Sequence, residues 1–249
     1  KESTRVYPEA KFGGHILGFL GEDEKGKRGR YGLEGYFEDV LAGEPAKITS
    51  ESGGVRGFLG SAKKSSFAID GADLVLTIDR TIQFVACDKL RQAVEKHDAD
   101  GGTVIIMDPG SGAILAMCSY PDYDPNKFGE VSNLSVFNNP AIFFQYEPGS
   151  VFKAITMAAA VDMGKVGPQT TFEDTGSVKI GPDELKNSDL KAHGTQTMTD
   201  VLDESLNTGA VFAMRSMGPA DFRRYVKVFG FGEETGIDLF KEVTGDITS

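Results

Sequence analysis

Apolar residues are most concentrated in one stretch past the middle of the chain. Residues 151–163 are apolar almost all round, and this pattern is typical of a buried helix rather than a helix at the surface. Pro148 and Gly149 interrupt the chain just before this stretch, and Gly164 is a stop signal after it. We therefore predict a buried helix that starts just after Gly149 and ends near Gly164.

A second patterned region precedes this helix. Residues 74–78 form a short, continuous apolar run, which predicts a buried strand. Asp79 follows directly and is a residue type that caps helices. Apolar residues then recur at helical spacing as far as a polar stretch at 98–102, so we predict a helix between Asp79 and that stretch.

Two further apolar runs lie at residues 103–107 and 113–118, separated by Asp108-Pro109-Gly110-Ser111-Gly112. Turn residues between two such runs predict an antiparallel hairpin. Residues 121–140 contain several Pro and Asn residues without a periodic pattern. We predict that this segment is a long loop, which delivers the chain to the buried helix.

The two ends of the chain have weaker patterns. Residues 1 to about 70 are rich in glycine and charge, with one short helix predicted at 36–41 and an extended or hairpin segment at 55–66. Residues 165–198 predict loops and short strands. Near the C-terminus we predict a break at 205–209 and helices at 199–204, at 210–217 and from Pro219 to a stop at Gly230.

Composition limits the classes of function. The 249 residues are enough for one large domain or two smaller ones, and the net charge of −11 argues against a nucleic-acid partner. Three histidines without metal-ligand spacing indicate no metal site, and no cofactor is predicted. Cys87 and Cys118 leave open both their pairing and the redox compartment. No apolar run is long enough to span a membrane.

A single charged residue, Lys153, interrupts the predicted buried helix. Burial of an unpaired ammonium group costs several kcal/mol or lowers its pKa, so a lysine here needs a chemical reason. Ser150 lies three residues earlier, on the same face of the first turn. Because a desolvated lysine can accept the proton of a hydroxyl group, the pair predicts an activated serine nucleophile.

The Ser-x-x-Lys spacing occurs three times, starting at Ser61, Ser150 and Ser188. The copies at Ser61 and Ser188 lie in polar stretches and open no buried helix, so we interpret them as chance matches. For Ser150 the alternative is a helix start whose Lys153 side chain extends to water. This motif alone leaves the two interpretations about equally supported.

A second motif favours the catalytic interpretation. Ser205-Leu206-Asn207 is the only Ser-x-Asn in the chain and falls between two predicted helices, where a hydroxyl and an amide can reach a neighbouring site. Alone it would be interpreted as helix punctuation. Together with Ser-x-x-Lys and a later Lys-Thr-Gly, however, Ser-x-Asn belongs to the motif set of penicillin-binding proteins and class A β-lactamases.

The wider sequence resembles the class B, monofunctional penicillin-binding proteins, which are peptidoglycan D,D-transpeptidases. The resemblance implies an α/β (α+β) fold of the penicillin-binding-protein and β-lactamase type, with an antiparallel sheet and helices. Residues 1–72 would be part of a smaller N-terminal, dimerisation-like non-catalytic domain, and residues 73–249 the first part of the transpeptidase domain. The matching stretches follow the family's order over nearly the whole chain: Gly32-Leu33-Glu34, 74–79 with Ile82-Gln83, 107–117, 120–126, 147–150, 186–189 with His193-Gly194, and Gly230-Phe231-Gly232.

The resemblance also implies a role for each motif residue. Ser150 would attack the penultimate D-Ala carbonyl of a stem peptide, and Lys153 would take the Ser150 proton. Ser205 would relay a proton to the leaving group, and Asn207 would hold Lys153 and the substrate amide. The third motif of the family is absent, because Val243-Thr244-Gly245 lacks its lysine. We therefore expect a truncated chain that lacks later strands of the sheet and is by itself a poor enzyme.

Partners and place of action follow from the same resemblance. Stem peptides ending in D-Ala-D-Ala would be the substrates and β-lactam antibiotics the inhibitors, with a glycosyltransferase of the elongation or division machinery as a partner. The protein would act on the extracytoplasmic face of the bacterial membrane, anchored by an N-terminal segment outside this chain.

Two alternative functions stay open at this stage. One is a serine β-lactamase or D,D-carboxypeptidase, against which the 72 N-terminal residues argue because β-lactamases are compact single domains. The other is a non-catalytic scaffold that binds the cell wall, which the missing third motif favours.

Overall fold

The computed structural model describes residues 5–24, 26–44, 48–49, 64–65 and 67–247. The chain forms two compact units, unit 1 from Lys1–Phe144 with Gly236–Val243 and unit 2 from Gln145–Thr235 with Thr244–Ser249. The sequence predicts a boundary near residue 72 between a non-catalytic and a catalytic domain. The two compact units divide the chain at other positions and do not test that boundary, which stays a prediction. No helix in the described ranges has the length and apolar character needed to cross a membrane.

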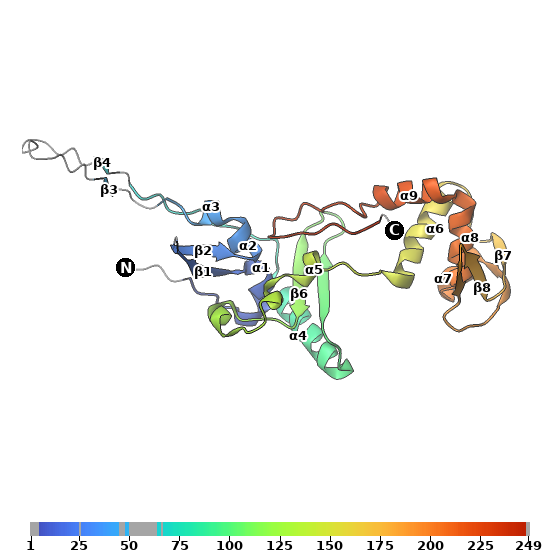
Figure 1. Cartoon of the computed structure of the whole chain (residues 1–249), viewed down its shortest axis with the longest axis horizontal. Helices are drawn as coiled ribbons and strands as arrows, with labels where there is room; N and C mark the ends of the chain where they lie inside the picture. The colour runs from blue at the N-terminus through green and yellow to red at the C-terminus, as the bar shows by residue number, and fades with distance from the viewer. Residues whose placement is uncertain (1–4, 25, 45–47, 50–63, 66, 248–249) are drawn as a thin grey trace, which may run out of the picture. The chain divides into compact units, whose positions relative to one another are not determined.

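The described residues of unit 1 form three antiparallel strand pairs, β1 with β2, β3 with β4 and β5 with β6 (Figure 1). The short helix predicted at 36–41 corresponds to α3, which begins two residues later than predicted, and most of the predicted segment 55–66 lies outside the described residues. The elements, with η for 3-10 helices, are η1 (Ala10–Gly13), α1 (Gly14–Leu17), β1 (Phe19–Asp23), β2 (Gly26–Arg30), α2 (Gly32–Tyr36), α3 (Glu38–Leu41), β3 (Ile48–Thr49), β4 (Lys64–Ser65), α4 (Arg80–His97), β5 (Gly102–Met107), β6 (Ile114–Tyr120), η2 (Pro125–Glu130), η3 (Leu134–Phe137) and α5 (Pro140–Phe143).

The predicted helix after Asp79 is confirmed as α4. The Asp79 carboxylate accepts hydrogen bonds from the backbone N–H groups of Thr81 and Ile82, both at 2.9 Å, and so caps the helix. The helix ends at its C-cap, Asp98, in a left-handed conformation with φ 50°. Both ends are therefore where local sequence signals place them.

The predicted hairpin is confirmed as β5 and β6, which pair antiparallel. The Asp108 carboxylate fixes the turn by accepting hydrogen bonds from the Gly110 N–H and the Ser111 hydroxyl. Helix α4 packs along β6 (Figure 1). There the Gln83 amide accepts from the N–H and donates to the carbonyl of Met117, each at 2.9 Å, which anchors α4 on the strand.

The predicted buried strand at residues 74–78 is wrong. These residues form no strand in the described part of the chain, and the Val75 side chain is 97% exposed. The Thr77 hydroxyl donates to the Ile114 carbonyl, and the Asp79 N–H donates to β6. Because only one of these two is a backbone–backbone bond, the segment runs beside β6 without building a ladder. An apolar run predicts burial, but a strand also needs a paired neighbour.

Cys87 of α4 and Cys118 of β6 form a disulfide, with their Cα atoms 5.4 Å apart. The bridge closes a loop with a sequence separation of 31 residues. It fastens the helix to the hairpin a few residues from the Gln83 contact. The pairing that the sequence left open is thereby settled.

Removal of this disulfide should destabilise the protein. A closed loop of this length corresponds to about 3 to 4 kcal/mol of unfolded-state entropy in the loop-closure model. We expect the Cys87→Ser, Cys118→Ser double variant to lose about that much free energy of unfolding in a urea titration. Dithiothreitol should bring the parent protein to the same stability and leave the double variant unchanged. Equal stability of parent and variant without reductant would contradict the prediction.

In the described part of unit 2, β7 pairs with β10 and β8 with β9, both antiparallel, beside a group of helices (Figure 1). The predicted short strands within 165–198 and the predicted helix from Pro219 to the stop at Gly230 are confirmed. Its elements are η4 (Gly149–Phe152), α6 (Lys153–Asp162), β7 (Thr171–Asp174), β8 (Ser177–Ile180), β9 (Asp183–Lys186), β10 (Gly194–Thr197), α7 (Met198–Asp203), α8 (Asn207–Met217) and α9 (Pro219–Val228).

The core of unit 2 lies where α8 packs against α6, α7 and β7. Gly209 of α8 permits this approach, because a Cβ atom there would lie 2.2 Å from a Val201 methyl group of α7. Since α6 and α8 pack on each other, side chains at their starts have fixed relative positions. The buried core residues are Met157, Ala159, Ala160, Val166, Phe172, Met198, Val201, Leu206, Ala213 and Met217.

The predicted buried helix differs in two respects. Its α-helical part, α6, begins at Lys153, because residues Gly149–Phe152 form the 3-10 turn η4. It is also buried along only part of its circumference, since Ala154, Ala158 and Val161 are exposed. Its end before Gly164 is confirmed.

Candidate active site

Ser150 lies in η4, directly before α6. Gly149 takes a left-handed φ of 63° at the entrance to this turn, a conformation that glycine adopts without strain. The Ser150 side chain is exposed, and its hydroxyl makes no hydrogen bond with any residue in the described part of the chain. The hydroxyl is therefore accessible to an incoming molecule.

Lys153 is the first residue of α6, and it is only 8% exposed. Its Nζ donates to the Ser205 hydroxyl at 3.0 Å and to the Ser205 backbone carbonyl. Burial lowers the pKa of Lys153 below its ordinary value. The predicted burial of Lys153 is confirmed, and the alternative in which this side chain extends to water is wrong.

Ser205 joins α7 to α8 in a left-handed conformation with φ 53°, which is uncommon for a residue with a side chain. The next residue, Leu206, is 2% exposed and belongs to the core of unit 2. This anchored turn directs both oxygen atoms of Ser205 to the amine of Lys153, across a sequence separation of 52 residues. Ser205 therefore has an unfavourable backbone conformation at the point where the Ser-x-Asn motif contacts Lys153 of the Ser-x-x-Lys motif.

The hydrogen bonds of Lys153 limit the possible proton transfers. A neutral amine has two N–H donors and one lone pair, and the two Ser205 oxygens can occupy both donors. The lone pair then remains for the proton of Ser150, one turn away. The Ser205 hydroxyl accepts from Lys153 and keeps its own hydrogen for donation to another group. The arrangement leaves Lys153 an acceptor position and Ser205 a hydroxyl donor. The Ser150 hydroxyl is not among the hydrogen-bond partners of Lys153 in the described residues.

Asn207 is the first residue of α8. The predicted break at 205–209 places this residue in a loop, so the break is shorter than predicted. The helix starts three residues before the predicted position because the backbone N–H groups of Asn207 and Thr208 donate to the Asn187 side-chain oxygen, at 3.0 and 3.3 Å. The Asn207 side-chain amide donates to the Lys186 carbonyl at 2.7 Å. The expected contact between Asn207 and Lys153 is not among the hydrogen bonds of the described residues.

The other two Ser-x-x-Lys copies are not part of this arrangement. Ser188 and Lys191 are both exposed in the loop after β9, where the Lys191 backbone N–H bonds the Asp189 carboxylate. Ser61 lies outside the described residues. The interpretation of the Ser188 copy as a chance match agrees with its exposed loop.

Two buried polar residues next to this site, Asp174 and Asn187, have no motif in the sequence that marks them. Asp174, 1% exposed, carries no spacing signature, and Asn187 occurred only as one letter of a matching stretch. Their contacts join segments that are far apart in the sequence. A buried hydrogen-bond network of this kind has no local pattern to detect.

A comparison with known protein families identifies the family of this chain. Residues 102–249 match the penicillin binding protein transpeptidase domain. The chain belongs to the penicillin-binding protein transpeptidase family. Two relatives in this family are stage V sporulation protein D of Bacillus subtilis (strain 168), 37% identical over 98% of this chain, and the probable peptidoglycan D,D-transpeptidase PenA of Neisseria gonorrhoeae, 31% identical over 93%. The chain spans 38% and 39% of the length of these two relatives.

Solved structures of the transpeptidase family agree with the fold. Penicillin binding protein 3 from Mycobacterium tuberculosis superposes with a TM-score of 0.82 at 27% identity, over 97% of this chain and 50% of that one. Its complex with aztreonam gives a TM-score of 0.83 at 26% identity, over 98% and 50%, and a complex with ampicillin is equally similar. The predicted α/β (α+β) fold of helices and antiparallel strands is confirmed.

Proposed function

We propose that the protein is a peptidoglycan D,D-transpeptidase that forms an acyl-enzyme on Ser150. The observation that supports this most is the capture of the buried Lys153 amine by both oxygens of Ser205, one turn from the exposed Ser150. Membership of the transpeptidase family supports the same reaction class. Because this chain spans about 38% of its relatives' length and has no Lys-Thr-Gly, the proposal concerns a form of the protein that carries that motif.

In the proposed reaction, the Ser150 oxygen attacks the carbonyl carbon of the penultimate D-Ala, and Lys153 takes the hydroxyl proton. The peptide bond to the terminal D-Ala breaks, and Ser205 donates a proton to the leaving amine while recovering one from Lys153. An amine of a second stem peptide then attacks the acyl carbon and forms the new amide bond as the ester bond to Ser150 breaks. The proton that the amine loses passes through Ser205 and Lys153 to the Ser150 oxygen, which restores the hydroxyl. The backbone N–H of Ser150 is one donor to the negatively charged oxygen formed in each attack.

β-Lactams enter this proposal as substrate analogues that acylate Ser150 and are released slowly. The solved complexes of a similar protein with aztreonam and ampicillin support the proposal. We also propose that the protein acts on the extracytoplasmic side of the membrane. The Cys87–Cys118 disulfide supports that location, because disulfides persist in oxidising compartments. A glycosyltransferase of the cell-wall machinery stays an expected partner.

A fluorescent penicillin distinguishes this proposal from its alternatives. After incubation and denaturation, a form that includes the Lys-Thr-Gly motif should carry a stable covalent label. Rapid turnover of the label would favour a β-lactamase, and absence of label a scaffold. A second assay with a D-Ala-D-Ala peptide distinguishes a carboxypeptidase, which would release D-Ala without cross-linking. The 249-residue chain serves as the comparison and should label weakly or not at all, because it has no third motif to hold the substrate carboxylate.

A further inference from the structure

A buried carboxylate lies in unit 2 behind the catalytic segment and has no part in the proposed reaction. Asp174, the last residue of β7, has a side chain that is 0% exposed. A buried charge is costly unless it is fully hydrogen-bonded, so its surroundings need an explanation. We refer to Asp174, Asn187, His193 and Thr208 as the Asp174 network.

Asp174 accepts hydrogen bonds from several separate segments. Its Oδ1 accepts the Gly176 backbone N–H at 2.9 Å and the Thr208 hydroxyl at 2.7 Å. Its Oδ2 accepts the Asn187 amide at 2.8 Å. The backbone N–H and the ring Nδ1 of His193 bond the same oxygen, at 3.1 and 2.7 Å. The carboxylate therefore ties the ends of β7, β9 and β10 to the start of α8.

Asn187 extends this network to the active site. Its amide nitrogen donates to Asp174, so its oxygen must face the other way, towards the start of α8. There the oxygen accepts the backbone N–H groups of Asn207 and Thr208. The N-cap residue Leu206 supplies no side-chain cap, so Asn187 caps α8 from a distant segment. The hydrogen bond from Asn187 to Asp174 and the cap that Asn187 provides therefore determine together where α8 begins.

His193 completes the network on its outer side. Its Nδ1 bonds Asp174 of β7, and its Nε2 lies 3.0 Å from the Asp189 carboxylate of its own loop. The Lys191 backbone N–H of that loop donates to the Asp189 carboxylate and lowers its pKa. The α8 residue that contacts Asp174 is the uncharged Thr208. The Asp174 hydrogen bond raises the pKa of His193 above its ordinary value. Only protonated His193 can donate to both carboxylates.

We propose that Asp174 and Asn187 are positioning residues of the active site, which fix the start of α8 and thereby hold Ser205 and Asn207 in place relative to Lys153. His193 supports this arrangement by binding Asp174. The inference rests on the proposed function of Ser150 and identifies residues that this function requires beyond the motifs. It also explains why a carboxylate is retained in the interior next to the Ser-x-Asn segment.

The network has a pH dependence that can be measured on the unmodified chain. A raised pKa means that the contribution of protonated His193 is complete below about pH 6.5, the ordinary value, and is lost as the pH rises through the folded-state pKa. In NMR spectra the backbone N–H signals of Asn207 and Thr208 should shift with the midpoint of the His193 ring signals. A His193→Gln variant identifies those ring signals and should remove the shift. Asn207 and Thr208 signals that stay constant through the titration would overturn the supporting role of His193.

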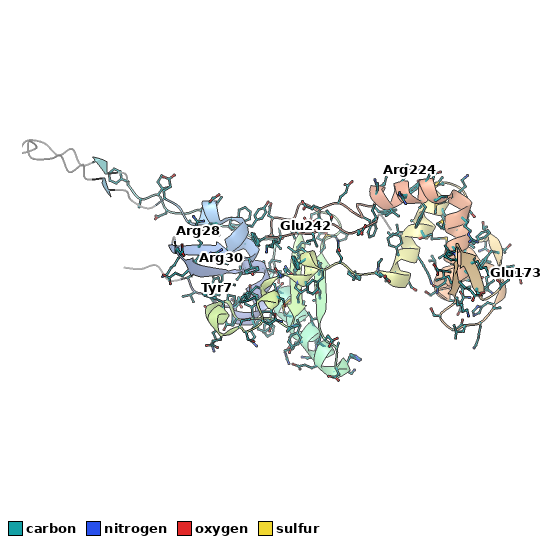
Figure 2. All side chains as sticks on the ribbon, viewed as in Figure 1. Tyr7, Arg28, Arg30, Glu173, Arg224 and Glu242 are labelled. Atoms are coloured by element: carbon teal, nitrogen blue, oxygen red, sulfur yellow. A yellow bond between two sulfur atoms is a disulfide. The ribbon has the colours of Figure 1, made fainter. Side chains whose placement is uncertain are left out.

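The positioning role is tested by acylation kinetics in a form that carries the Lys-Thr-Gly motif. Asn187→Ala should slow acylation by fluorescent penicillin about 10- to 100-fold at a temperature where the variant is fully folded. A purely structural role would lower the melting temperature and leave the rate of the folded protein unchanged. Glu173→Gln is the matched control, because this neighbouring residue, labelled in Figure 2, is exposed on β7. Its carboxylate accepts a hydrogen bond from the Thr195 hydroxyl, outside the Asp174 network. Its acylation rate should equal that of the parent.

A second pair of variants covers the case in which Asn187→Ala does not fold. Thr208→Val keeps the side-chain volume and removes the hydroxyl that donates to Asp174, whereas Thr208→Ser keeps the hydroxyl. We expect slower acylation in the valine variant and near-parent acylation in the serine variant. Parent rates in the folded Thr208→Val and Asn187→Ala variants would overturn the proposal. Labelling that survives Ser150→Ala would instead overturn the proposed function, while the NMR titration would still report on the network.

Discussion

Ser150→Ala is expected to abolish covalent labelling by penicillin in a form of the protein that includes the Lys-Thr-Gly motif. The covalent bond forms at the serine oxygen, and alanine offers no nucleophile in its place. The Ser150 side chain is exposed and its hydroxyl makes no hydrogen bond with a described residue, so loss of that hydroxyl should not disturb folding. Gel fluorescence after denaturation measures the label, and an unchanged melting temperature shows that the variant is folded.

The other Ser-x-x-Lys copies supply matched controls for this experiment. Ser188→Ala changes an exposed loop residue that is also followed by a lysine three positions later, and it should label as the parent does. Ser61→Ala should behave in the same way. Persistent label in Ser150→Ala, or its loss in either control, would show that the nucleophile is a different residue.

Lys153→Met should slow acylation by a factor of about 10² to 10⁴, the usual effect of losing a general base. Methionine has a similar length and is apolar, so it suits a site where only 8% of the lysine is exposed. It removes the amine that contacts both oxygens of Ser205. The rate constant is measured with the same penicillin at saturating and limiting concentrations, which separates binding from the chemical step.

The pH profile distinguishes a base from a residue that only maintains structure. Because burial lowers the pKa of Lys153, the parent rate should rise as the pH increases through that lowered pKa, where the amine becomes neutral. The rise in acylation rate with pH that titration of Lys153 causes should be absent in Lys153→Met. Lys191→Met, in the exposed loop, is the matched control and should keep the parent profile. Acylation at the parent rate in Lys153→Met would assign the proton transfer to another group.

Local signals account for the elements that sequence analysis predicted correctly. The Asp79 cap and the turn at 108–112 depend on side chains that bond backbone groups within three residues, so their effect can be recognised in the sequence. Burial of Lys153 was predictable for a similar reason, since its neighbours in the chain are also its neighbours in the helix. The two motifs therefore identified the candidate nucleophile and its base.

Contacts between distant segments account for what the sequence did not show. Residues 74–78 have the composition of a strand, but pairing depends on a neighbour that composition does not specify. The start of α8 depends on Asn187, 20 residues upstream of Asn207. The left-handed conformation at Ser205 likewise could not be predicted, because the residue at this position is not a glycine. Each of these features is decided by tertiary structure.

The anchoring of Leu206 changes how the second motif should be written. A pattern such as Ser-x-Asn treats its middle position as free, whereas here that side chain is 2% exposed in the core of unit 2. Any replacement must keep the volume and apolar character of leucine, or the flanking serine and asparagine lose their fixed point. The central position of the motif therefore carries information about packing, and a search profile that required an apolar residue there would reject chance matches that the chemistry alone admits.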